Sequence, residues 1–307
     1  MIVHSTTGDE RSEMSVGVVL GAGGPLGWAY HLGVIEGVRE AIGREPANAD
    51  RVIGTSAGAA IAATLLTGVP TEEVLELITA PPSAEDQERM RSAGSKALRN
   101  PVRALRPLAP GLVRQVGRVG VTTALSGLLP AGLFPTVFLR RFGADEIWPE
   151  PLWIPSVRID DGEVVVFGRD DVPATLGDAI EATSAIPGVF APKLIDGARY
   201  VDGGVVSSTH ADALLPEQHD IALVAAPMTR PGGGPLRARA RRRLDDEVAA
   251  LRAAGTSTLV LTPDENTLAA AEGFPRQRPE AGADIVAAAR RQTVTAFRNH
   301  GPPGHRH

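Results

Sequence analysis

The clearest structural signal in the chain is the segment RVIGTSAG, residues 51–58. Its β-branched start predicts a short buried strand, and the alanine-rich sequence that continues to Thr67 predicts a helix. Ser56 stands at the turn between them, with Gly54 and Gly58 two positions to either side. Glycines at these positions allow the chain to turn sharply, so that the serine oxygen is exposed at the tip. Ser56 is therefore a candidate catalytic nucleophile, although a lone G-x-S-x-G is also compatible with an ordinary tight turn.

A second glycine-rich turn lies upstream, in GAGGPLG at residues 21–27. The backbone N–H groups of Gly23 and Gly24 can point at an anion because no side chain obstructs them, and Ala57 directly after the nucleophile can supply a further donor. A dinucleotide-binding loop is the natural alternative. It fits poorly, because Leu26 occupies the third glycine position of G-x-G-x-x-G, and the absence of a following GK[ST] excludes a P-loop.

Strand-like and helix-like segments alternate along the chain, which indicates an α/β fold: a three-layer α/β/α sandwich with a mainly parallel central sheet and a helical cap insertion. The expected strands cover residues 15–20, 51–53, 152–159, 163–167, 197–201, 221–225 and 258–261, and the expected helices cover 28–42, 57–67, 175–184, 236–253 and 281–297. We expect a disordered segment at 1–14, one domain over 15–297 with the cap at about 81–150, and a flexible tail at 298–307.

Composition limits the possible functions. The chain of 307 residues is 43% hydrophobic, which is enough for a substantial core, and its net charge of -5 argues against general nucleic-acid binding. The absence of cysteine excludes disulfides and thiolate metal sites. The polar start shows neither a signal peptide nor a membrane anchor, so the expected location is cytoplasmic, with peripheral contact at the inner membrane face left open.

Two arginine-rich segments stand out. Between Glu88 and Asp145 there is no acidic residue, and the basic residues there are Arg89, Arg91, Lys96, Arg99, Arg103, Arg106, Arg114, Arg118, Arg140 and Arg141. Interleaved apolar residues predict amphipathic helices that contact anionic membranes, or a lid with solvated arginines. The second segment, RARARRR at 237–243, is followed by acidic residues at 245–247 and is predicted to be a solvated helix with i,i+4 ion pairs.

Acyl transfer needs a general base beside the nucleophile. Asp202 is the simplest candidate because it ends an expected strand and is followed by Gly203 and Gly204, although this pattern also suits a plain turn. A carboxylate acts as a base at neutral pH if burial raises its pKa. His210 and His219 follow Asp202 in the order of a Ser-Asp-His triad and are the less favoured alternative.

Four motifs, in this order, resemble the patatin-like phospholipase family of bacterial type. They are GAGGPLG at 21–27, GTSAG at 54–58, ATSAIPGVFAP at 182–192 and YVDGG at 200–204. The resemblance covers about residues 16–207. It implies a three-layer α/β/α fold, a Ser-Asp dyad without histidine, and hydrolysis of acyl esters of lipids.

Carried over to this sequence, the resemblance makes Ser56 the nucleophile and Asp202 the base, with an oxyanion hole around Gly23 and Gly24. The supporting motif positions are Gly21, Ala22, Gly27, Gly54, Gly58, Gly203 and Gly204. The family's loop usually has three consecutive glycines and a basic residue before the final glycine. Here Ala22 occupies the first of those positions and Leu26 the basic one, which removes a positive charge near the site.

The leading hypothesis is a serine acyl hydrolase that needs no metal or organic cofactor and acts on phospholipids, lysophospholipids or neutral acyl esters. The alternative, motivated by Leu26, is a catalytically weak lipid-binding or regulatory protein that docks on anionic membranes. A nucleotide-binding oxidoreductase is a distant third. The sequence does not indicate acyl-chain length, head group or oligomeric state.

Overall fold

The computed structural model describes residues 14–43, 45, 48–80, 88, 146–187, 189–229, 234–275, 278 and 280–300. The expected cap at 81–150 lies outside these residues apart from 88 and 146–150, as do 1–13 and 301–307. The domain boundaries proposed above therefore stay predictions.

The described chain forms one eight-stranded sheet, in the order β5-β6-β3-β2-β1-β7-β8 with β4 on β3. The strands are β1 (Val16–Leu20), β2 (Arg51–Gly54), β3 (Leu152–Arg158), β4 (Val164–Phe167), β5 (Lys193–Ile195), β6 (Ala198–Asp202), β7 (Ile221–Ala225) and β8 (Ser257–Leu261). The five strands from β3 to β8 along this order are parallel, whereas β4, β5 and β6 run antiparallel to their neighbours. The expectation of a mainly parallel sheet is confirmed.

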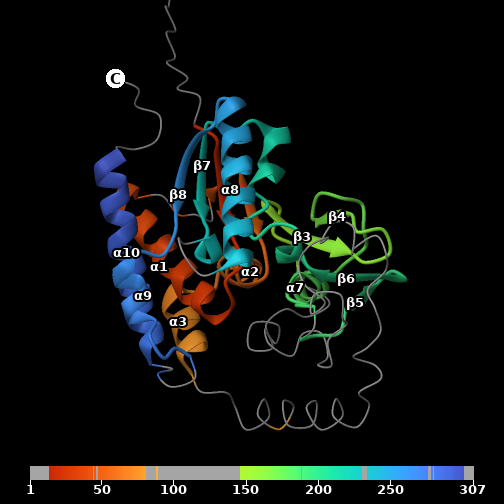
Figure 1. Cartoon of the computed structure of the whole chain (residues 1–307), viewed down its shortest axis with the longest axis horizontal. Helices are drawn as coiled ribbons and strands as arrows, with labels where there is room; N and C mark the ends of the chain where they lie inside the picture. Colours follow the sequence, from red (N-terminus) through yellow and green to blue (C-terminus); the bar gives the residue numbers. More distant parts are fainter. Residues whose placement is uncertain are drawn as a thin grey trace, which may run out of the picture.

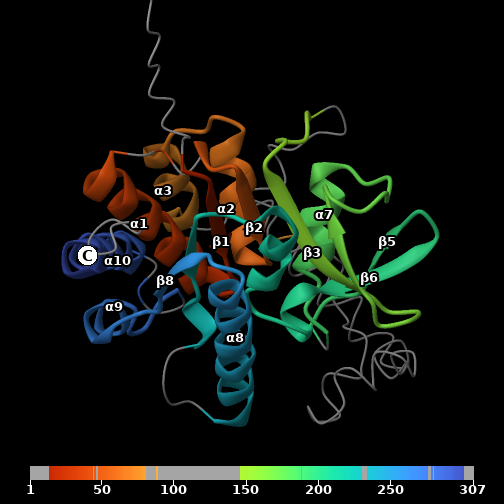
Figure 2. The same ribbon diagram turned by 90° about the horizontal axis from the view of Figure 1, so that it is seen from above.

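Helices cover both faces of the sheet. They are α1 (Gly24–Ile42), α2 (Ala57–Leu66), α3 (Thr71–Thr79), α7 (Leu176–Thr183), α8 (Pro235–Ala253), α9 (Glu265–Ala270) and α10 (Ala281–His300), with short 3-10 helices η4 (Gly203–Val205), η5 (Ala211–Glu217) and η6 (Pro227–Thr229). Helix α8 lies on one side of the sheet, and α1, α2, α3 and α10 lie on the other (Figures 1 and 2).

Alternate residues of the central strands enter two separate cores. Val18 and Leu20 of β1 pack with α1, α2 and α10, whereas Val19 packs on the α8 side with residues such as Leu244 and Leu251. Because successive side chains of a strand point to opposite faces, a strand buried on both sides serves two layers at once. The expected three-layer sandwich is confirmed.

Strand β3 joins the parallel and antiparallel parts of the sheet. The Val52 N–H donates to the Pro151 carbonyl at 2.7 Å beside β2, and the Ile159 N–H donates to the Arg199 carbonyl at 2.8 Å beside β6. Pro151 and Ile159 are an even number of residues apart, and the backbone groups of every second residue of a strand point to the same edge. Strands β2 and β6 therefore share one edge of β3. The turn after β2 and the end of β6 are therefore brought together, although more than a hundred residues separate them in the chain.

The expected strands and helices outside the cap are all present, and α3, α9 and β5 are additional. The last helix, α10, runs to His300 and so includes three residues that were expected in the tail. The largest boundary difference is at the first helix, which starts at Gly24, inside the glycine-rich turn. The reason is Pro25, whose fixed φ and missing N–H suit the first turn of a helix. None of the helices in the described ranges combines the length and the hydrophobicity that crossing a membrane requires.

Candidate active site

Ser56 stands at a strained turn between β2 and α2. Its φ of 53 and ψ of -116 lie in a region that non-glycine residues rarely adopt. Ser56 is only 6% exposed. The turn is tight because a Cβ on Gly54 would lie 2.6 Å from the Ala59 Cα, and one on Gly58 would lie 1.9 Å from the Leu20 carbonyl oxygen. Both glycines of the motif are thus required by packing, as expected for a nucleophile elbow.

Thr183, at the end of α7, holds this turn in place. Its Oγ1 accepts a hydrogen bond of 3.1 Å from the Ser56 N–H and donates one of 2.6 Å to the Pro155 carbonyl of β3. The residue is fully buried. Thr183 lies within the third motif quoted above, but the sequence did not indicate this role.

Asp202 ends β6 and faces the serine. The Ser56 side chain lies beside its carboxyl and lowers the pKa of that group, and the carboxyl Oδ1 accepts a 2.7 Å hydrogen bond from the Gly204 N–H. Burial raises the pKa of Asp202 to about 7, against the opposing effect of the Gly204 N–H and the Ser56 side chain. The carboxyl can therefore exchange a proton with the Ser56 hydroxyl near neutral pH.

The glycine-rich turn presents N–H groups beside the pair. Within the described chain, neither the Gly23 nor the Gly24 N–H donates a backbone hydrogen bond, and the same holds for Ala57 at the start of α2. The turn is anchored from behind, because the buried His31 Nε2–H donates to the Gly21 carbonyl at 2.6 Å and the Ala22 N–H donates to the Ser208 carbonyl at 2.7 Å. These N–H groups are available to an oxyanion.

A pocket of about 320 Å³ contains these groups. Its lining residues include Ala22, Gly23, Gly24, Ser56, Asp202 and Gly204 among those expected from the sequence, together with Ile186, Pro187, Val205, Val206, Ser208, Met228, Arg237, Arg239, Ala240 and Arg243. The lining does not include Ala57, Gly21, Gly27, Gly54, Gly58 or Gly203. The structure thus brings the main predicted site residues into one cavity.

The two histidines considered for a triad hydrogen-bond elsewhere. The buried His210 donates from Nε2 to the Gly203 carbonyl at 2.9 Å, and burial lowers its pKa. His219 Nδ1 shares a 2.8 Å hydrogen bond with the Ser15 hydroxyl at the opposite end of β1. Their contacts are structural, and His210 supports the backbone next to Asp202.

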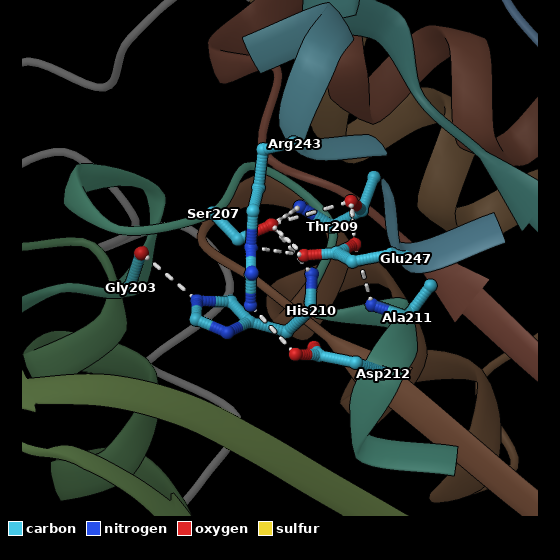
Figure 3. A network of polar contacts seen from close by, with 8 residues as sticks. All are labelled: Gly203, Ser207, Thr209, His210, Ala211, Asp212, Arg243 and Glu247. Atoms are coloured by element: carbon cyan, nitrogen blue, oxygen red, sulfur yellow. Dashed lines mark hydrogen bonds and ion pairs between the residues drawn. The ribbon is translucent and has the colours of Figure 1, made fainter. Parts of the chain in front are cut away.

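A buried carboxylate on α8 organises the chain that follows Asp202 (Figure 3). Glu247 is 1% exposed and accepts hydrogen bonds of 2.6 Å from the hydroxyls of Ser207 and Thr209, and of 2.9 Å from the Ala211 N–H. A sequence signal for it existed: Glu247 lies on the same helix face as Leu244, three residues earlier, and that face is buried.

Arg243 links this network to the pocket. Its guanidinium lies 3.0 Å from Glu247 and 2.6 Å from Asp212 (Figure 3). Arg243 also lines the cavity. The expected i,i+4 ion pairs on α8 are present, both here and between Arg241 and Asp245 at 2.9 Å. The expectation of a wholly solvated helix is wrong, because one face of α8 forms a wall of the pocket.

Leu26, which replaces the basic residue of the resembling family, is partly buried and packs against the larger core. It supplies no charge to the pocket. Whatever positive charge the pocket has must therefore come from other elements.

The chain is similar to known proteins in sequence and in structure. The family model described as patatin-like phospholipase matches residues 18–215, which is more than half of the chain. Among solved structures, VipD from Legionella pneumophila is similar with a TM-score of 0.45 and 14% identity, over 94% of this chain and 67% of VipD. The type III effector protein ExoU is similar with a TM-score of 0.37 and 17% identity, over 92% of this chain and 53% of ExoU, so the chain spans about half of that protein. From the family match, this chain belongs to the patatin-like phospholipases.

Proposed function

We propose that this protein is a serine acyl hydrolase that cleaves fatty-acyl esters of lipids with a Ser56–Asp202 dyad. The observation that carries the proposal is the place of the Ser56 side chain, at a strained turn beside a buried carboxyl whose pKa is raised to about 7. Membership of the patatin-like family supports the general activity, hydrolysis of acyl lipids. The roles of the individual residues are our inference.

In the first half-reaction, the Ser56 Oγ attacks the ester carbonyl while its proton passes to the Asp202 carboxylate. The N–H groups of Gly23 and Gly24, with Ala57 nearby, stabilise the oxyanion. The ester C–O bond then breaks, and the protonated Asp202 returns the proton to the leaving alcohol. An acyl-enzyme on Ser56 remains.

In the second half-reaction, the Asp202 carboxylate takes a proton from water as the water oxygen attacks the acyl carbonyl. The tetrahedral intermediate collapses, the Ser56 oxygen recovers the proton, and the fatty acid leaves. Every proton is handled by the same carboxyl, so no metal, organic cofactor or histidine is needed in this scheme.

The apolar side of the pocket, with Ile186, Val206 and Met228, suits an acyl chain. We further propose that the arginine-rich segment at 81–150 contacts anionic membranes peripherally, at the cytoplasmic face. Most of that segment lies outside the described residues, and the support for it is its sequence alone.

The direct test is hydrolysis of p-nitrophenyl acyl esters together with labelling by a fluorophosphonate probe. We expect Ser56→Ala and Asp202→Asn each to lower kcat/KM by at least about a thousandfold, because nucleophile and base act as one unit. Ser56→Ala should also abolish labelling. The matched control is Ser257→Ala, at an exposed position on β8, which should retain both signals.

Two results would contradict the proposal. One is undiminished turnover in Ser56→Ala. The other is loss of activity in His210→Ala without loss of folding while Asp202→Asn stays active, which would favour a histidine base. Binding to anionic liposomes without hydrolysis across acyl lengths would instead support the lipid-binding alternative that Leu26 suggests.

A further inference from the structure

Three arginines of α8 form one wall of the pocket that holds Ser56 and Asp202. Arg237, Arg239 and Arg243 are half-buried and line the cavity, whereas Arg241 and Arg242 on the same helix are exposed and do not. The arginine-rich helix therefore has an inner and an outer set of guanidinium groups. Only the inner set is in a position to meet a bound molecule.

The inner set gives the lining of the pocket more guanidinium groups than carboxylates. Asp202 is the one carboxylate among the described lining residues, against three guanidinium groups. Arg243 is additionally paired with Asp212 and Glu247, which fix its orientation and offset its charge. Arg237 lies in the first turn of the 19-residue helix α8, where the helix dipole adds to the attraction for an anion.

The other walls of the pocket are chemically different. They carry the apolar side chains of Ile186, Val205, Val206 and Met228. Ile186 and Met228 are each 42% exposed, so their apolar surface is open to a bound molecule. A ligand that satisfies both kinds of wall has a hydrocarbon part and a negatively charged part.

We propose that Arg237 and Arg239, with the fixed Arg243, form an anion subsite that selects acyl esters carrying a phosphate group close to the ester bond. This inference rests on the proposed acyl hydrolase function and specifies its substrate. The planar guanidinium fork suits phosphate oxygens, with which it forms charged hydrogen bonds. The positive charge that Leu26 does not provide from the glycine-rich turn is supplied here by α8.

The test compares two substrates with the same acyl chain, a 1-acylglycerol 3-phosphate and the neutral 1-acylglycerol, both below their micelle concentrations. We expect the wild type to prefer the phosphate ester in kcat/KM. Arg237→Gln should lower the ratio of the two kcat/KM values by about tenfold, and Arg237→Gln with Arg239→Gln by more, because each charged hydrogen bond lost costs about that factor.

Arg242→Gln is the matched control, since it removes the same charge from the outer face of the same helix. Its ratio should equal that of the wild type. The subsite proposal is overturned if the double variant keeps the wild-type ratio, or if Arg242→Gln lowers the ratio equally, which would indicate only long-range attraction.

A binding experiment separates failure of the subsite from failure of the hydrolase function. A 1-O-alkylglycerol 3-phosphate has no acyl ester, and its affinity relative to 1-O-alkylglycerol is measured by calorimetry. If the protein hydrolyses nothing but the wild type prefers the phosphate ether and Arg237→Gln loses that preference, the subsite stands and the enzyme function does not. Equal binding of both ethers overturns the subsite.

Inorganic phosphate serves as the third ligand. If it binds as tightly as the phosphate ether, the site is one for free phosphate, and the selection of lipids is overturned.

Discussion

At the scale of single residues, the unusual group is the carboxyl of Asp202. It is 5% exposed, and the groups that favour its charged form are the Gly204 N–H and the Ser56 side chain rather than a cation. Burial disfavours the charged form, and these two groups compensate only in part, so the pKa rises to about 7. A base with this pKa is ionised often enough at neutral pH to accept a proton and weakly enough to return it.

We therefore predict that kcat/KM rises with pH and levels off above an apparent pKa near 7. The sign follows from the role: the base must be ionised, and below its pKa the carboxyl is protonated and cannot accept the serine proton. A pH series from about 5 to about 9 measures this, with circular dichroism at each pH as the control for folding. An apparent pKa near 4, the ordinary range for a carboxyl, would contradict the assignment.

His31 does not complicate this profile. Burial lowers its pKa to about 4, so the ring stays neutral throughout the range in which Asp202 titrates. Its Nε2–H donates to the Gly21 carbonyl at 2.6 Å in that form. The hydrogen bond that anchors the glycine-rich turn is therefore the same below and above pH 7.

At the scale of elements, α8 does more than cover the sheet. Through Glu247 it binds the chain around Thr209, and through Arg243 it lines the pocket. The fully buried carboxylate of Glu247 accepts hydrogen bonds from two hydroxyls and one backbone N–H, and it forms an ion pair with the Arg243 guanidinium. Removing it leaves several buried polar groups without a partner, which is more costly than losing a surface ion pair.

We predict that Glu247→Ala lowers the free energy of unfolding by about 3–5 kcal/mol, and that Glu247→Gln lowers it by about 1–3 kcal/mol because the amide keeps one acceptor. Urea denaturation measures both. Asp246→Ala, the exposed neighbour on the same helix, is the control and should change the stability by less than about 0.5 kcal/mol. Equal effects at the two positions would show that the network does not stabilise the fold.

At the scale of the whole molecule, the site depends on the close packing of α10 against α1, the helix that starts at the glycine-rich turn. A Cβ on Gly33 would lie 2.3 Å from the Val286 carbonyl oxygen, and one on Gly37 would lie 2.8 Å from the Arg290 carbonyl oxygen. The two helices therefore touch backbone to backbone. The pair Arg290–Glu40 at 2.6 Å adds an exposed contact of small value.

We predict that Gly33→Ala lowers the free energy of unfolding by about 2–3 kcal/mol, because the new methyl group displaces backbone rather than a flexible side chain. The matched substitution is Gly43→Ala at the end of α1. There a Cβ meets open space and only the positive φ of 65 is unfavourable, at about 1 kcal/mol. Thermal and urea denaturation distinguish the two, and a Gly33→Ala variant as stable as Gly43→Ala would refute close packing here.

Local sequence was sufficient for the fold class and for the elements that carry the nucleophile. β-branched runs predicted β1, β2 and β7 within a residue or two, and the turn at Ser56 follows from Gly54 and Gly58. These features depend on residues close together in the chain, where backbone sterics and the burial of a repeating apolar pattern decide the conformation. Asp202 was identified in the same way, from a strand that ends in two glycines and from the family motif.

Only the tertiary structure decided how these pieces meet. Asp202 reaches Ser56 because β2 and β6 share one edge of β3, a pairing that no local pattern encodes. The arginines of α8 were expected in solvent, yet one set of them lines the pocket. A sequence shows that a helix has a charged face, but the direction in which that face points depends on long-range packing, here on the burial of Leu244 and Glu247 against the sheet and the chain after Asp202.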